Sequence, residues 1–300
     1  MNLSKILIPK SNDAENGMHY VKANAVVAEE KNSLDVIVVG DSESFATIIP
    51  MKLWEDYGYT TYVSGTPAQV LTETLSQTYK IFKSQSPKIL ILEANNVFKN
   101  IELDSPIEEV LKYLLPVVDY HSRWKHLKKD DFTIDPDYTW KDEMKGYDYS
   151  LVIDKADSSK YMEYTDEVEE IKPFNKLCLK ILNKFCKNNG TELMVISTPS
   201  TVNWNYKKHN GIEKFLKEEN IDFLDLNILA GEIGIDWEKD TRDKGDHLNH
   251  TGAIKATDYI GKYLSKKNIL ENHKDDEKYS KWNELLEKYK QREQQKEEKI

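Results

Sequence analysis

Four polar blocks of the sequence contain the residue types that acyl transfer requires. Ser42 comes directly after a strand-like apolar run, and His247 lies in the polar loop "TRDKGDHLNH" towards the C-terminus. A serine hydroxyl is a weak nucleophile until a histidine takes its proton, and a carboxylate must orient that histidine. Gly65 and Asn95 follow two further apolar runs. Their amides, with the amide of Ser42, could stabilise the oxyanion of a tetrahedral intermediate.

Two carboxylates, Asp243 and Asp246, lie close enough in sequence to orient His247. Neighbouring side chains in extended backbone point to opposite sides, so Asp246 is poorly placed to reach the ring of the next residue. Asp243 lies four residues before His247, and Lys244-Gly245 can form a tight turn that folds Asp243 over the imidazole. We therefore expect Asp243 to be the triad acid, with Asp246 as the alternative. Asp246 would more naturally bond backbone amides and shape the loop.

Each block also has a purely structural interpretation. A Gly-Asp-Ser sequence is commonly a turn followed by a helix cap, and Asn95 and Asn96 could both be turn residues. Asn249 or Thr251 could simply begin a helix over "GAIKATDYIGKYL". The order of the blocks along the chain is what favours a catalytic triad.

Asp243, Asp246, His247 and His250 also suggest a metal site. Zinc requires two or three convergent imidazoles or thiolates. The remaining histidines have no ligand spacing: His19, His121, His126, His209 and His273. We therefore expect neither a metal nor another cofactor.

The elements that must position these residues belong to an α/β fold. Apolar segments rich in Val, Ile and Leu alternate with segments of helical periodicity, as in a parallel sheet covered on both faces. One helix contains both cysteines, and another runs from Pro67, which is expected in its first turn. The predicted strands cover residues 33–40, 60–65, 87–96, 191–199 and 221–227.

In open parallel sheets, ligands bind beyond the carboxyl ends of the strands, where the winding direction reverses. With a flavodoxin-like strand order, Ser42 and Asn95 would face each other across that crevice. Gly65 would lie beside them, and His247 would arrive from the last loop. The fold class is therefore predicted as a three-layer α/β/α, flavodoxin-like fold with a mostly parallel five-stranded sheet.

The net charge and the lengths of the apolar runs argue against two classes of function, nucleic-acid binding and membrane spanning. The 300-residue chain has a net charge of −10 and no basic stripe, which argues against nucleic-acid binding. No apolar run approaches the roughly 20 residues that span a bilayer, so the chain as given is expected to be soluble. We predict a catalytic domain over 1–271 with an aromatic insertion at about 97–170. A charged helix or tail follows at 272–300, where apolar residues keep helical spacing.

The four blocks together resemble the SGNH (GDSL-like) hydrolase superfamily. A closer resemblance, carried by "KNSLDVIVVGDSES", "PKILILEANNVF", "SRWKHL" and "GDHLNHTGA", is to the SGNH proteins that accompany membrane-bound O-acyltransferases in bacterial cell-surface polysaccharide O-acetylation. It implies an esterase or O-acetyltransferase that works through an acyl-serine, with an acyl donor and a polysaccharide acceptor. It also implies an extracytoplasmic, membrane-associated full-length protein with a membrane-bound partner. A simple carbohydrate or lipid esterase and a non-catalytic polysaccharide-binding scaffold are the alternatives.

Two positions depart from the superfamily pattern. The superfamily usually places its acid three residues before the histidine, where this chain has Lys244. Its third block usually reads Gly-x-Asn, whereas this chain has Glu93-Ala94-Asn95-Asn96. Either asparagine could therefore be the oxyanion donor.

Overall fold

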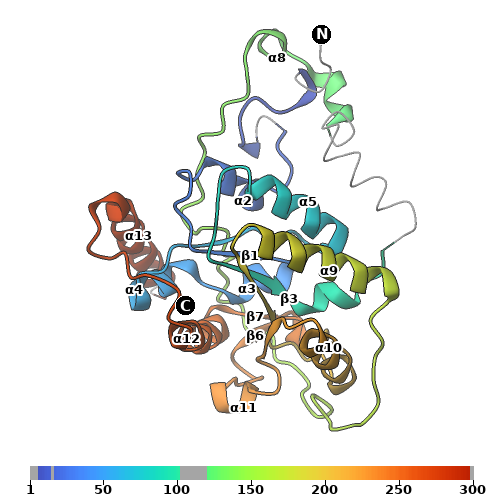
Figure 1. Cartoon of the computed structure of the whole chain (residues 1–300). Helices are drawn as coiled ribbons and strands as arrows, with labels where there is room; N and C mark the ends of the chain where they lie inside the picture. Colours follow the sequence, from blue (N-terminus) through green and yellow to red (C-terminus); the bar gives the residue numbers. More distant parts are fainter. Residues whose placement is uncertain (1–5, 15–16, 102–119, 298–300) are drawn as a thin grey trace.

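The computed structural model describes residues 6–14, 17–101 and 120–297 (Figure 1). Its centre is a five-stranded parallel sheet in the order β2-β1-β3-β4-β5. The predicted α/β class and flavodoxin-like order are confirmed. The strands are β1 (Val36–Val39), β2 (Thr61–Val63), β3 (Ile89–Glu93), β4 (Glu192–Ser197) and β5 (Asp222–Asp225).

Alternate residues of the strands enter two separate hydrophobic clusters, one on each face of the sheet. Ile37 and Leu90 pack in the cluster that also contains residues of α5, α9 and α10. Val38 and Ile91 pack in the cluster with residues of α4 and α12. Every residue of β1 and β3 is buried, which explains why both strands read as apolar runs, broken only by Glu93 at the end of β3. The main helices are α4 (Pro50–Tyr57), α5 (Leu71–Ile81), α9 (Pro173–Asn188), α10 (Tyr206–Glu218) and α12 (His250–Lys266).

The start of α5 differs from the prediction. The helix begins at Leu71, so Pro67 lies outside it, and Ala68 has a left-handed φ of 55°. The Glu73 carboxylate accepts a hydrogen bond from the Val70 amide at 2.9 Å. This bond supplies a partner for a backbone donor at the helix start and fixes the beginning of α5 four residues after the proline.

The predicted insertion lies between β3 and α9, and residues 102–119 of it are outside the described part of the chain. Its described residues contain short helices, η4 (His121–His126) and α8 (Asp130–Thr133). The chain then runs beside the hairpin that contains His247. Ser150 accepts a hydrogen bond from the His250 amide at 2.7 Å, and the Asp154 amide donates to the Thr241 carbonyl at 3.0 Å. Residues 150–154 of the insertion therefore lie against this hairpin and the start of α12.

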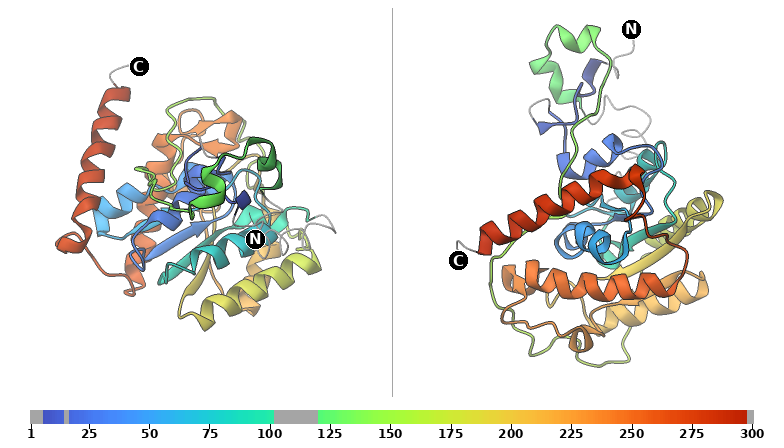
Figure 2. Two further views of the ribbon diagram at one scale, coloured as in Figure 1. Left: turned by 90° about the horizontal axis from the view of Figure 1, so that it is seen from above. Right: turned by 90° about the vertical axis from the view of Figure 1, so that its left-hand side faces the viewer.

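The C-terminal helix α13 (Ser280–Glu297) lies across α4 (Figure 2). Trp282 and Tyr289 are buried, and the Trp282 ring lies 5.4 Å from that of Trp54. The Trp54 indole also donates to the Asn283 side chain at 3.0 Å. The apolar residues seen at helical spacing in this charged segment are thus the ones that attach it to the domain. Within the described ranges, no helix has the length and apolar character needed to cross a membrane.

Candidate active site

A sharp strand-to-helix turn positions Ser42 at the carboxyl end of β1. Gly40 has a φ of 145°, and a Cβ there would lie 2.6 Å from the Cβ of Glu93, so only glycine fits. Asp41 caps the following helix α3 (Ser42–Thr47) by accepting from the Glu43 amide at 3.2 Å. Ser42 is the first residue of α3, where backbone amides have no partner within the helix. Its amide is therefore suited to bind an oxyanion.

His247 reaches Ser42 from a short hairpin near the other end of the chain. Strands β6 (Thr241–Arg242) and β7 (His247–Leu248) pair antiparallel, which places His247 opposite Arg242. The His247 Nε2 atom lies 2.8 Å from the Ser42 Oγ atom. In the tautomer with the proton on Nδ1, Nε2 accepts a hydrogen bond from the serine hydroxyl. This is the contact that a general base requires.

Asp243 lies on the opposite side of the imidazole. Its Oδ2 atom is 3.1 Å from His247 Nδ1, within hydrogen-bond distance. Asp243, Lys244 and Gly245 all have positive φ values, of 55°, 57° and 92°. A Cβ on Gly245 would lie 2.1 Å from the Thr201 hydroxyl. The strained turn folds the acid over the ring in the way the sequence predicts, although 59% of the Asp243 side chain is exposed.

Asp246 also faces His247, but at a greater distance. Its Oδ2 atom lies 3.7 Å from His247 Nδ1, which is too long for a hydrogen bond. Its Oδ1 atom accepts from the Asn203 side-chain amide. The sequence predicts backbone amides as the partners of Asp246. The observed bond is to a side chain, in the loop after β4.

The candidate oxyanion donors gather around the Ser42 turn. A Cβ on Gly65 would lie 3.0 Å from the Asp41 carbonyl, so Gly65 packs directly against this turn. Asn95 lies in η3 (Ala94–Phe98), and its Nδ2 atom donates to Asp41 Oδ2 at 3.2 Å. The Asn96 side chain instead donates to the Gln69 carbonyl at 2.9 Å and is fully buried. Of the two asparagines, Asn95 is therefore the one beside Ser42.

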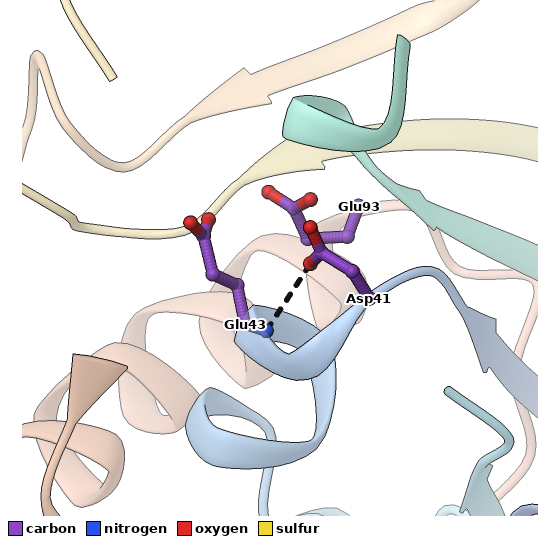
Figure 3. A group of neighbouring side chains, drawn as sticks. All are labelled: Asp41, Glu43 and Glu93. Atoms are coloured by element: carbon purple, nitrogen blue, oxygen red, sulfur yellow. Dashed lines mark hydrogen bonds between the residues drawn. The ribbon is translucent and has the colours of Figure 1, made fainter. Parts of the chain in front are cut away.

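Three buried carboxylates, Asp41, Glu43 and Glu93, gather in one group (Figure 3). Asp41 and Glu43 are the chain neighbours of Ser42. One oxygen from each of the three carboxylates lies within 4.8 Å of the others. Burial and the neighbouring Asp41 raise the pKa of Glu43 to about 8, and burial raises the pKa of Glu93 well above its usual range. Glu43 and Glu93 therefore retain protons near neutral pH, while the ammonium group of Lys99 pairs with Asp41.

Sequence reasoning missed Glu43 and Glu93 as parts of this site. Two features of the sequence could have indicated them: Glu43 immediately follows Ser42, and Glu93 ends an otherwise apolar strand. It also missed Asn203 and Lys208, which approach from the carboxyl end of β4. Loops at that end of a parallel sheet are the expected source of site residues.

The four residues considered as a metal site do not gather at one point. His250 turns away and is buried, with Nδ1 2.9 Å from the Tyr147 hydroxyl and Nε2 2.8 Å from Glu293. Its ring stacks on Tyr149, with centroids 4.2 Å apart. Over the described residues, the group of three potential ligands that does gather is the carboxylate group Asp41, Glu43 and Glu93.

No family model matches the sequence, and no curated protein does. Several solved structures resemble the fold. Esterase EstA from Pseudoalteromonas sp. aligns with 78% of this chain and 98% of its own, at 9% identity and a TM-score of 0.43. A lipase/acylhydrolase from Enterococcus faecalis aligns with 78% and 97%, at 10% identity and a TM-score of 0.42. A GDSL-like lipase from Bacteroides thetaiotaomicron aligns with 82% and 99%, at 11% identity and a TM-score of 0.42. Similarity at this level carries no functional argument.

Proposed function

We propose that this chain transfers an acyl group from an ester through an acyl-serine intermediate on Ser42. The observation that carries the proposal is the 2.8 Å contact between Ser42 Oγ and His247 Nε2. A carboxylate on the far side of the same ring supports it. A serine, a histidine and an acid in this mutual geometry perform acyl transfer on several unrelated folds.

In the first half-reaction, Ser42 Oγ attacks the ester carbonyl carbon while its proton passes to His247 Nε2. Asp243 holds the Nδ1 proton and stabilises the imidazolium that forms, as proposed for the triad acid. The amides of Ser42 and Gly65 and the Asn95 side chain bind the oxyanion. Collapse of this intermediate breaks the bond to the alcohol oxygen, which takes the proton from His247, and leaves the acyl-serine.

In the second half-reaction, a hydroxyl compound replaces the departed alcohol. His247 removes the proton of water or of an acceptor hydroxyl, whose oxygen attacks the acyl-serine carbonyl. The bond to Ser42 Oγ then breaks, and the proton returns to the serine. Water as the attacking group gives ester hydrolysis, and a sugar hydroxyl gives transfer.

The finer form of the proposal is acetyl transfer to a cell-surface polysaccharide outside the cytoplasm, in cooperation with a membrane-bound O-acyltransferase. The resemblance of "GDSES" and "GDHLNHTGA" to the SGNH proteins of such systems supports this form. Product analysis with an acetyl donor and a polysaccharide acceptor separates it from simple hydrolysis. Acetylated polysaccharide indicates transfer, whereas free acetate alone indicates an esterase.

Replacement of the nucleophile tests the common core of both forms. Ser42→Ala should lower the hydrolysis of an activated acetyl ester by about 10³-fold or more, as for other disrupted triads. A serine-reactive phosphonate should label the unaltered protein and the exposed control Ser158→Ala, but not Ser42→Ala. Full activity in a folded Ser42→Ala protein would refute the acyl-serine mechanism. Absence of labelling and of activity in the unaltered protein would instead favour a non-catalytic scaffold.

A further inference from the structure

Lys208 approaches the candidate oxyanion hole from helix α10. Its Nζ atom donates to Asn95 Oδ1 at 3.1 Å and to the Asn203 carbonyl at 2.7 Å. The ammonium group also lies 5.5 Å from the centre of the Phe98 ring. The side chain is only partly exposed, because these groups surround its charged end.

The two partners of Asn95 fix the orientation of its side-chain amide. An ammonium group has three donors and no acceptor, so the Asn95 atom that faces Lys208 must be the oxygen. The Asp41 carboxylate accepts only, so the Asn95 atom 3.2 Å from its Oδ2 must be the nitrogen. Both contacts require the same orientation. One Nδ2 hydrogen binds Asp41, and no other acceptor for the second is present among the described residues, so it is available to a ligand.

We propose that Lys208 is a positioning residue that turns the Asn95 amide group towards the oxyanion and strengthens it as a donor. The inference rests on the proposed acyl transfer at Ser42. A cation on the amide oxygen draws electron density from the amide, which makes its N–H groups stronger donors. The charge also adds to the preorganised field in which the oxyanion forms.

A purely structural role for Lys208 makes a different prediction. The bond to the Asn203 carbonyl connects α10 to the loop after β4, so loss of Lys208 could lower stability without involving Asn95. In that case the effects of changing Lys208 and Asn95 would be independent. If Lys208 acts through Asn95, its effect must disappear once the Asn95 amide is removed.

The test is a double-mutant cycle on the full chain, with an activated acetyl ester as substrate. Removal of one oxyanion donor typically lowers kcat by about 10²–10³-fold. Lys208→Met, which acts only through such a donor, should lower kcat by about 10–100-fold with little change in KM. In the Asn95→Ala background, Lys208→Met should cause less than about a twofold further loss. Lys207→Met is the matched control. Lys207 lies on the same turn of α10 as Lys208, but it pairs with the exposed Glu167. This control should behave like the unaltered protein.

Unchanged kcat in Lys208→Met, or losses that multiply with those of Asn95→Ala, would overturn the positioning role. If Lys208→Met does not fold at the assay temperature, Lys208→Gln provides the same cycle, since glutamine keeps a neutral donor. Ser42→Ala distinguishes failure of the proposed function from failure of the proposed role of Lys208. If it remains fully active, the proposed function fails. If it is inactive while Lys208→Met is fully active, only the role of Lys208 is wrong.

Discussion

The clearest test of the triad acid compares Asp243→Asn with Asp246→Asn. Both substitutions remove one negative charge near His247 and keep the side-chain shape. Asp243 lies 3.1 Å from His247 Nδ1, whereas Asp246 lies 3.7 Å away and is bonded to Asn203. Asparagine at 246 can still accept from Asn203 through its Oδ1 atom. Only the change at 243 removes a carboxylate hydrogen-bond partner of the His247 ring.

The expected size of the effect follows from the exposure of Asp243. Two unit charges about 4 Å apart interact by about 4 kcal/mol at an effective dielectric constant of 20, and by about 1 kcal/mol in water. Since 59% of the Asp243 side chain is exposed, its stabilisation of the imidazolium should lie towards the lower value, about 1–3 kcal/mol. That range corresponds to a loss in kcat of about 5–150-fold. The loss for Asp246→Asn should be less than about 5-fold, with a small decrease in stability.

The assay is hydrolysis of an activated acetyl ester, with kcat measured over a range of pH for the two variants and the unaltered protein. Circular dichroism and thermal denaturation confirm that each variant is folded. A larger kcat loss in Asp246→Asn than in Asp243→Asn would refute the assignment and make Asp246 the triad acid. Equal small losses would show that the imidazolium needs neither carboxylate.

Three further predictions address the surroundings of Ser42. Gly65→Ala should cost about 1–3 kcal/mol of stability and lower kcat, because the added Cβ would lie 2.3 Å from the Ser44 hydroxyl and 3.0 Å from the Asp41 carbonyl, so the turn around Ser42 must shift; an unchanged melting temperature and rate would contradict this. Glu43 has its pKa raised from 4.5 to about 8, so the folded state binds more protons than the unfolded state in that range and stability should fall as pH rises through it. Glu43→Gln should flatten the decline in melting temperature between about pH 5 and 8; an identical slope would show that another group causes it. Dialysis against a chelator should leave activity unchanged, because a serine triad needs no Lewis acid, whereas loss that zinc restores would indicate a metal site.

The sheet was largely predictable because its strands are buried on both faces and therefore read as apolar runs. The strand order was predicted by taking the flavodoxin-like arrangement of parallel sheets, and it brings Ser42 and Asn95 to one edge. The turn at Lys244-Gly245 was predictable as well, because it depends on local backbone chemistry. Each apolar run, and the turn, depends on a few consecutive residues.

Other features depend on contacts between distant segments, and the sequence alone does not reveal them. Glu43 and Glu93 are adjacent because β1 and β3 pair in one particular register. Lys208 and Asn95 are 113 residues apart in the sequence, and they meet only in the folded chain. The start of α5 was mispredicted because the side chain of Glu73, rather than the ring of Pro67, sets the first turn.

The attachment of α13 links the C-terminus of the described chain to the hairpin that contains His247. Glu293, on the last turns of α13, bonds the buried imidazole of His250, which begins α12 three residues after His247. If this part of α13 detaches, the imidazole loses Glu293, its hydrogen-bond partner at Nε2. Detachment of α13 therefore costs additional free energy, because a hydrogen bond to His250 at the start of α12 is lost. Amide hydrogens in the last turns of α13 and around His250 should consequently exchange as one cooperative unit. Denaturant should expose both at the same concentration, even though the two segments share no secondary structure.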